Sequence, residues 1–96
     1  MSNELKQIIL DPQVKGRNKV VLSVLHCISS PRRIATCSED WLREATTLGP
    51  RKLETRLEHM VHLGLLKPRT PPLPKNGSKM LCYEILYPLT LPKEKL

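Results

Sequence analysis

The residues best suited to chemistry lie between positions 49 and 66, where cationic side chains recur at helical spacing. At about 100° per residue, Leu53, Leu57 and Met60 share one side of a helix, which predicts that this side faces a core. The other side is polar, and its two flanks differ in charge. Guanidinium and ammonium groups on an exposed helix bind carboxylates or phosphates. The basic flank consists of Lys52, Arg56 and His59, and the acidic flank of Glu54 and Glu58.

The overall charge favours an anionic partner. Sixteen Lys and Arg residues against nine Asp and Glu residues give a formal net charge of +7 over 96 residues. Nucleic acid is the first candidate for such a chain. The length predicts one domain, and 40% hydrophobic residues suffice for a small core. Because Phe is absent, we expect that core to be aliphatic.

Other function classes lack the residues they need. The chain has no paired carboxylates, no Gly-rich phosphate loop and no nucleophilic triad, so we expect neither an enzyme nor a cofactor. It has no run of 18 apolar residues and no signal-peptide pattern, so we expect no membrane span and an intracellular, cytoplasmic, nucleoid-associated protein. The chain has three widely spaced cysteines, Cys27, Cys37 and Cys82, a pattern that indicates reduced thiols. The alternative is an intracellular disulfide of the kind found in hyperthermophile proteins.

A metal site is expected to be absent. His59 and His62 share a helix face, and Cys37 is a conceivable third ligand. Two imidazoles at this spacing are too few for a closed zinc site. A metal- or thiol-responsive regulator is therefore the least favoured hypothesis.

The surrounding elements must hold the 49–66 stretch in place. We predict a short helix over residues 2–10, a core helix over 17–29, a brief extended segment at 34–35 and a third helix over 38–46. For this third helix we expect a Thr36–Glu39 capping box, with Ser38 as the alternative cap. Its expected buried side is Trp41, Leu42 and Ala45.

The two following turns complete the pattern. Gly49 ends a tight turn, and Pro50 suits the first position of the next helix. Gly64 suits the end of that helix, and we predict strands over 65–69 and 79–87 with a stiff, proline-rich loop between them. Two short helices joined by such a turn form a helix-turn-helix.

This order of elements resembles the winged helix-turn-helix superfamily of small bacterial and archaeal transcription regulators. The similarity covers residues 34–69 and is closest in LETRLEHMVHLGLLKPR. It implies a mainly α fold with a small β-hairpin (α+β), with three core helices, a short N-terminal helix and a two- to three-stranded wing. Residues 1–96 would be one domain, with the N-terminal helix over 1–12, the core over 13–87 and an extended tail over 88–96.

The resemblance also implies roles for residues. Residues 50–63 would be the recognition helix in the major groove, and the wing, residues 70–79, would lie on the backbone or in the minor groove. Glu54 departs from the smaller polar residues usual in the family. The residues expected to read bases are Arg51, Lys52 and Thr55. Those expected at phosphates or in the wing are Arg32, Arg33, Arg56, His59, Lys75, Asn76 and Lys79.

The expected function is therefore sequence-specific binding of double-stranded DNA by a small transcription regulator. A homodimer is expected because a single small unit contacts little DNA. The alternative is a protein-interaction winged helix within a larger assembly, which the acidic flank and the Pro71–Pro74 loop favour. The apolar residues predicted to stay on the surface and to form the dimer contact are Leu5, Ile8, Ile9, Tyr87, Leu89 and Leu91.

Overall fold

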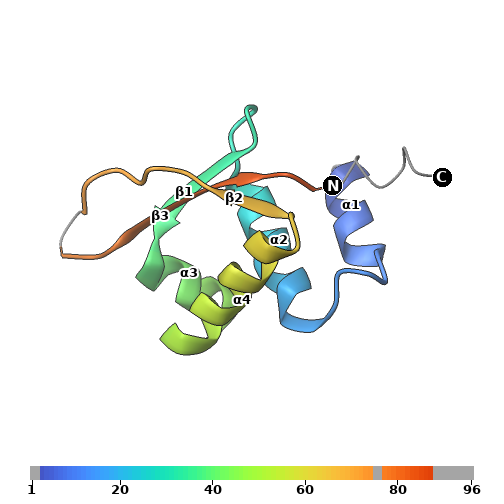
Figure 1. Ribbon diagram of the computed structural model, residues 1–96, viewed down its shortest axis with the longest axis horizontal. Helices are drawn as coiled ribbons and strands as arrows, with labels where there is room; N and C mark the ends of the chain where they lie inside the picture. Colours follow the sequence, from blue (N-terminus) through green and yellow to red (C-terminus); the bar gives the residue numbers. More distant parts are fainter. Residues whose placement is uncertain (1–2, 75–76, 88–96) are drawn as a thin grey trace.

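The computed structural model describes residues 3–74 and 77–87, and in these ranges the chain is α+β with four helices and a three-stranded antiparallel sheet. Lys75, Asn76 and the predicted tail over 88–96 lie outside the described residues. The sheet runs along one side of helices α2, α3 and α4, and α1 lies at one end (Figure 1). The elements are α1 (Asn3–Leu10), α2 (Gly16–Ile28), β1 (Ile34–Ser38), α3 (Glu39–Thr46), α4 (Pro50–His62), β2 (Leu66–Pro68) and β3 (Met80–Ile85).

Strand β3 is the centre of the sheet, with β1 on one side and β2 on the other. The predicted pair of strands after α4 is confirmed as β2 and β3, with Leu66 opposite Ile85. The expected short segment at 34–35 is longer than predicted, because it pairs with β3 along five residues from Ile34↔Glu84 to Ser38↔Met80. Backbone pairing with a strand far along the chain therefore extends β1 beyond what its local sequence indicates.

Apart from Tyr87, the buried core is made of aliphatic side chains and one methionine, much as the composition predicts. It lies between the sheet and the helices, so burial of apolar surface holds α2, α3 and α4 against the strands. Ile8 brings α1 into the same cluster. The largest side chains that are less than 2% exposed are Ile8, Val21, Leu22, Leu25, Leu42, Leu53, Met60, Leu66 and Ile85.

Helix α3 begins with a cap at Ser38, whose Oγ accepts a hydrogen bond from the Trp41 amide at 3.1 Å. The alternative cap is thus confirmed, and the Thr36 capping box is wrong. Thr36 lies in β1, where pairing with β3 holds it in an extended conformation, and its Oγ1 lies 3.4 Å from the sulfur of Cys82.

The buried side of α3 also differs from the prediction. Leu42 is buried, but Trp41 is 45% exposed and Ala45 is exposed. Thr46 takes the inward position instead, and its hydroxyl donates to the Leu42 carbonyl at 2.7 Å. Because this bond satisfies the hydroxyl within the helix, a polar residue is tolerated where the apolar pattern suggested alanine.

Two of the side chains predicted to lie on the surface for a dimer contact are instead part of the core. Ile8 is fully buried, and Tyr87 is 6% exposed with its hydroxyl donating to Asp11 Oδ2 at 2.9 Å. Burial and this hydrogen bond raise the pKa of Tyr87 to about 12. Ile9 and Leu10 at the end of α1 do remain on the surface, 41% and 75% exposed. The apolar surface available to a second copy is therefore smaller than the sequence suggested.

In the described part of the chain, no helix combines the length and apolar character needed to span a bilayer.

Candidate nucleic-acid interface

Helix α4 turns one face inward and presents the opposite face to solvent. Leu53, Leu57 and Met60 are at most 4% exposed, which fixes the rotation of the helix. Arg51 and Thr55 therefore point outward, and both are exposed. Pro50 occupies the start of the helix, where its missing amide hydrogen costs nothing. The predicted helix over 50–63 is confirmed to within one residue.

A hollow with a cavity volume of about 670 Å³ lies between the start of α4 and the start of α2. Both helices begin on the lower side of the view in Figure 1. We call this site the basic hollow, because its lining contains five cationic side chains and no carboxylate. It is lined by Lys15, Gly16, Arg17, Arg51, Lys52, Thr55 and Arg56.

The backbone adds to the positive potential of the basic hollow. Neither α2 nor α4 has an acidic residue in its first turn, and neither Lys15 nor Gly49 caps its helix with a side-chain hydrogen bond. The first amides of each helix therefore keep their hydrogen-bonding capacity, and both helix dipoles direct positive charge to this end. The arrangement suits a phosphate group or another multivalent anion.

The sequence did not identify Lys15 and Arg17 as site residues. Their signal is the Lys15–Gly16–Arg17 triplet directly before a core helix, where Gly16 adopts a left-handed φ of 55°. The triplet joins the basic flank of α4 only because α2 packs against α4. No local pattern predicts that packing.

The acidic flank of α4 is exposed and lies near Tyr83 of the sheet. Burial raises the pKa of Tyr83 in β3, and the nearby carboxylates of Glu58 and Glu54 raise it further. The two flanks therefore lie on different sides of α4, with the basic flank toward α2 and the acidic flank toward β3. A polyanion approaching α4 would meet attraction on the α2 side.

Arg32 and Arg33 are not brought to the basic hollow. Their loop between α2 and β1 lies on the upper side of the view in Figure 1, whereas α4 begins on the lower side. Arg33 is also engaged, since its Nε donates to the Ile85 carbonyl at 3.0 Å and its Nη1 to both carboxylate oxygens of Glu4. Its charge links α1 to the sheet, which separates it from the expected phosphate contacts on α4.

The remaining predicted residues are divided between α4 and the wing. His59 is exposed, and its Nδ1 lies 3.1 Å from the side-chain nitrogen of Asn18. Lys79 is exposed just before β3, and its carbonyl accepts the Glu39 amide at 2.8 Å. That bond ties the start of β3 to α3. Two further wing residues, Lys75 and Asn76, lie outside the described part of the chain.

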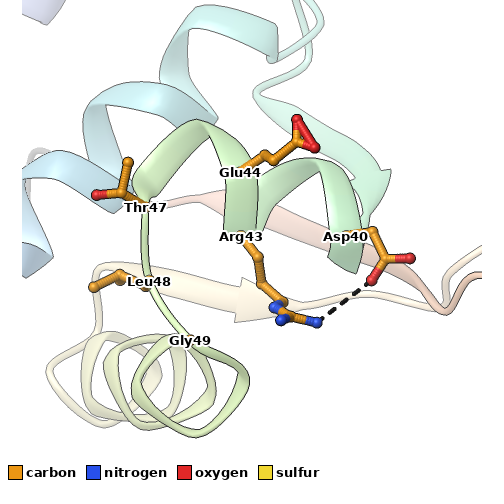
Figure 2. Close-up of a pocket in the computed structure, with 6 residues that line it drawn as sticks. All are labelled: Asp40, Arg43, Glu44, Thr47, Leu48 and Gly49. Atoms are coloured by element: carbon orange, nitrogen blue, oxygen red, sulfur yellow. Dashed lines mark ion pairs between the residues drawn. The ribbon is translucent and has the colours of Figure 1, made fainter.

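A second hollow, at the turn between α3 and α4, has the wrong charge for an anion. Figure 2 shows Arg43 directed toward Asp40, and the ion pair measures 3.6 Å. Glu44 adds another carboxylate, so negative charges outnumber positive ones in this lining. Its cavity volume is about 660 Å³, and its residues are Asp40, Arg43, Glu44, Thr47, Leu48 and Gly49.

The described residues hold no group of three or more His, Cys, Asp or Glu side chains arranged for a metal ion. Cys37 is half-buried, and burial, with a smaller effect of Cys82, raises the pKa of its thiol to about 11. A protonated thiol is a poor metal ligand. The three cysteines are free.

Comparison of the chain with known proteins yields no match among family models, curated proteins or solved structures.

Proposed function

We propose that this chain is a winged-helix protein that binds double-stranded DNA and acts as a small cytoplasmic, nucleoid-associated transcription regulator. The order of helices and strands and the β1–β3–β2 sheet are compatible with that fold. The observation that carries the proposal is the basic hollow. It combines five cations with the starts of α2 and α4, neither of which has a side-chain cap. The first turn of α4 is exposed beside it.

In the proposed complex, a backbone phosphate occupies the basic hollow and the start of α4 enters the major groove. Lys52 and Arg56 then contact phosphate, while Arg51 reaches the base edges. The groove, about 12 Å wide, admits an α-helix. Thr55 is a weaker candidate for base reading, because its hydroxyl already donates to the Arg51 carbonyl at 2.9 Å and offers only acceptor capacity.

Titration of duplex DNA at several salt concentrations tests the proposal. Each neutralised phosphate contributes about −0.9 to the slope of log K against log salt. With Arg51 at the base edges, the other four cations of the basic hollow set a slope of about −3.6 if all of them engage phosphates. Absence of binding at low salt, or binding indifferent to salt, would overturn the proposal.

A matched pair of charge reversals separates the basic hollow from net charge. Arg17→Glu places a carboxylate in the basic hollow, whereas Arg32→Glu makes the same change in the exposed loop at the other end of the molecule. We expect a large loss of affinity for the first variant and a small one for the second. Equal losses would mean that DNA responds only to total charge.

A protein-binding role within a larger assembly is the second candidate. The observation in its favour is exposed apolar surface outside the basic hollow, with Trp41 45% and Leu73 86% exposed. For the DNA-binding function, we also propose a homodimer formed through Ile9 and Leu10 of α1. Sedimentation that gives a monomer at micromolar concentration would exclude that dimer.

A further inference from the structure

Asn18 is a buried polar residue whose side chain bonds to another helix. It lies in α2 and is 6% exposed. Its Oδ1 accepts a hydrogen bond from Arg56 Nη1 at 3.4 Å, and its Nδ2 lies 3.1 Å from His59 Nδ1. Both partners belong to α4. Burial of an amide is costly unless such bonds satisfy it, so these contacts define how α2 and α4 meet.

Hydrogen-bond polarity determines the orientation of this amide. A guanidinium group can only donate, so the oxygen of Asn18 must face Arg56. The NH₂ group then faces His59, whose Nδ1 must accept. The tautomer that this contact requires has Nδ1 as the acceptor and the ring proton on Nε2. Since Nδ1 is held toward α2 and the residue is exposed, the Nε2–H group is left for an outside acceptor.

We propose that Asn18 is a positioning residue for phosphate recognition, an inference that rests on the proposed DNA binding. It holds Arg56 where that residue lines the basic hollow, and it orients His59 so that Nε2–H can donate to a neighbouring phosphate. Ordering a long side chain on binding lowers affinity, so an arginine ordered in advance binds phosphate more tightly. Asn18 itself is buried and need not touch the DNA.

The hydrogen-bond arrangement can be tested in the free protein. Nitrogen NMR of the neutral His59 ring should report the Nε2–H form with Nδ1 accepting. Asn18→Asp should switch the ring to the Nδ1–H form or the imidazolium, because a carboxylate only accepts. A wild-type ring protonated at Nδ1, or a ring unchanged by Asn18→Asp, would overturn the proposed orientation.

Affinity measurements test the positioning role. Asn18→Leu keeps similar volume without hydrogen bonds, and we expect binding to all duplexes to weaken about two- to tenfold, the effect of ordering one long side chain. Arg56→Ala should weaken binding and reduce the salt slope by about 0.9. Adding Asn18→Leu to an Arg56→Ala/His59→Ala variant should weaken binding no further, because Asn18 acts through these two residues.

The control is Thr46→Val, which also removes a buried hydrogen bond but one made within α3. It should lower stability without changing affinity. If Asn18→Leu does not fold, Asn18→Ala takes its place in the affinity measurements, because Asn18→Asp would still accept from Arg56 and would add a negative charge beside it. The positioning role alone would be overturned if Asn18 substitution left wild-type affinity unchanged. It would also be overturned if the substitution weakened the Arg56→Ala/His59→Ala variant as much as it weakens the wild type. Absence of wild-type binding would overturn the proposed function and the positioning role together.

Discussion

The carboxylate of Glu4 accepts two hydrogen bonds from Nη1 of Arg33, at 2.9 and 2.7 Å. His26 in α2 contacts the same carboxylate through Nε2 at 2.7 Å. Arg33 adopts a left-handed φ of 68°, which is unusual for a residue with a side chain, and it also donates to the Ile85 carbonyl. This small network joins α1, α2, the loop after α2 and β3, so it stabilises the fold at the end of the molecule away from the basic hollow.

Glu4→Gln should reveal how much this network stabilises the fold. Burial acts to raise the pKa of Glu4, but hydrogen bonds from Arg33 and His26 outweigh it and hold that pKa below the ordinary value of 4.5. The stabilisation is therefore fully present above about pH 4.5 and lost as the pH falls through the lower folded-state pKa. We expect Glu4→Gln to lower the free energy of unfolding by about 1 kcal/mol at neutral pH. The effect is modest because Glu4 and Arg33 are both partly exposed.

Urea denaturation at pH 7 and near pH 2 measures this effect. The difference between Glu4→Gln and wild type should shrink at the lower pH, as the wild-type carboxylate becomes protonated. Glu44→Gln, at an exposed position of α3, serves as the control and should change little. A difference that persists unchanged in acid would contradict the assignment of stability to the charged carboxylate.

Arg51 and Arg17 should contribute to DNA binding in different ways. Arg51→Ala removes the group that we propose to reach the base edges, so it should reduce affinity for the cognate site by about 1–3 kcal/mol with a smaller effect on random DNA. Arg17→Ala should weaken all sequences about equally and reduce the salt slope by about 0.9. Competition binding with cognate and random duplexes measures both. If Arg51→Ala and Arg17→Ala change the ratio of cognate to random affinity by the same factor, Arg51 does not read bases.

Ile8 and Ile9 are neighbours with opposite expectations. Ile8 is fully buried, so Ile8→Ala should lower the free energy of unfolding by about 2–4 kcal/mol through lost burial and a cavity. Ile9 is 41% exposed, so Ile9→Ala should cost less than about 1 kcal/mol in a monomer. If α1 forms the proposed dimer, Ile9→Ala should weaken self-association in sedimentation. A large stability loss for Ile9→Ala with no change in self-association would count against that contact.

The cysteines should differ in reactivity. Burial raises the pKa of Cys37 from 9.0 to about 11, so its thiolate fraction near pH 8 falls by about 100-fold. Cys27 is exposed. A disulfide reagent at pH 8 should therefore modify Cys27 quickly and Cys37 only on unfolding. Cys27→Ser should abolish the fast phase, and fast modification of Cys37 in that variant would show that its burial is transient.

Helices and the wing strands were predictable from the sequence because their signals are local. Apolar spacing, Pro50 and the residues flanking each segment predicted helices over 2–10, 17–29 and 38–46, which the structure has at Asn3–Leu10, Gly16–Ile28 and Glu39–Thr46. Side-chain periodicity acts within a few residues, so neighbouring positions suffice to indicate it. The charged flanks of α4 follow from the same periodicity.

Only the tertiary structure decided which charges act together. Arg17 joins Arg51 in the basic hollow, Arg33 pairs with Glu4, and Asn18 becomes buried against α4. Each relationship joins residues far apart in the chain, and each depends on how α2 or β3 packs on its neighbours. The residues next to an arginine or lysine in the sequence do not show whether its side chain will form an ion pair or line an open hollow. Its partner is selected by the packing of the shared core, which the local spacing of residues does not encode.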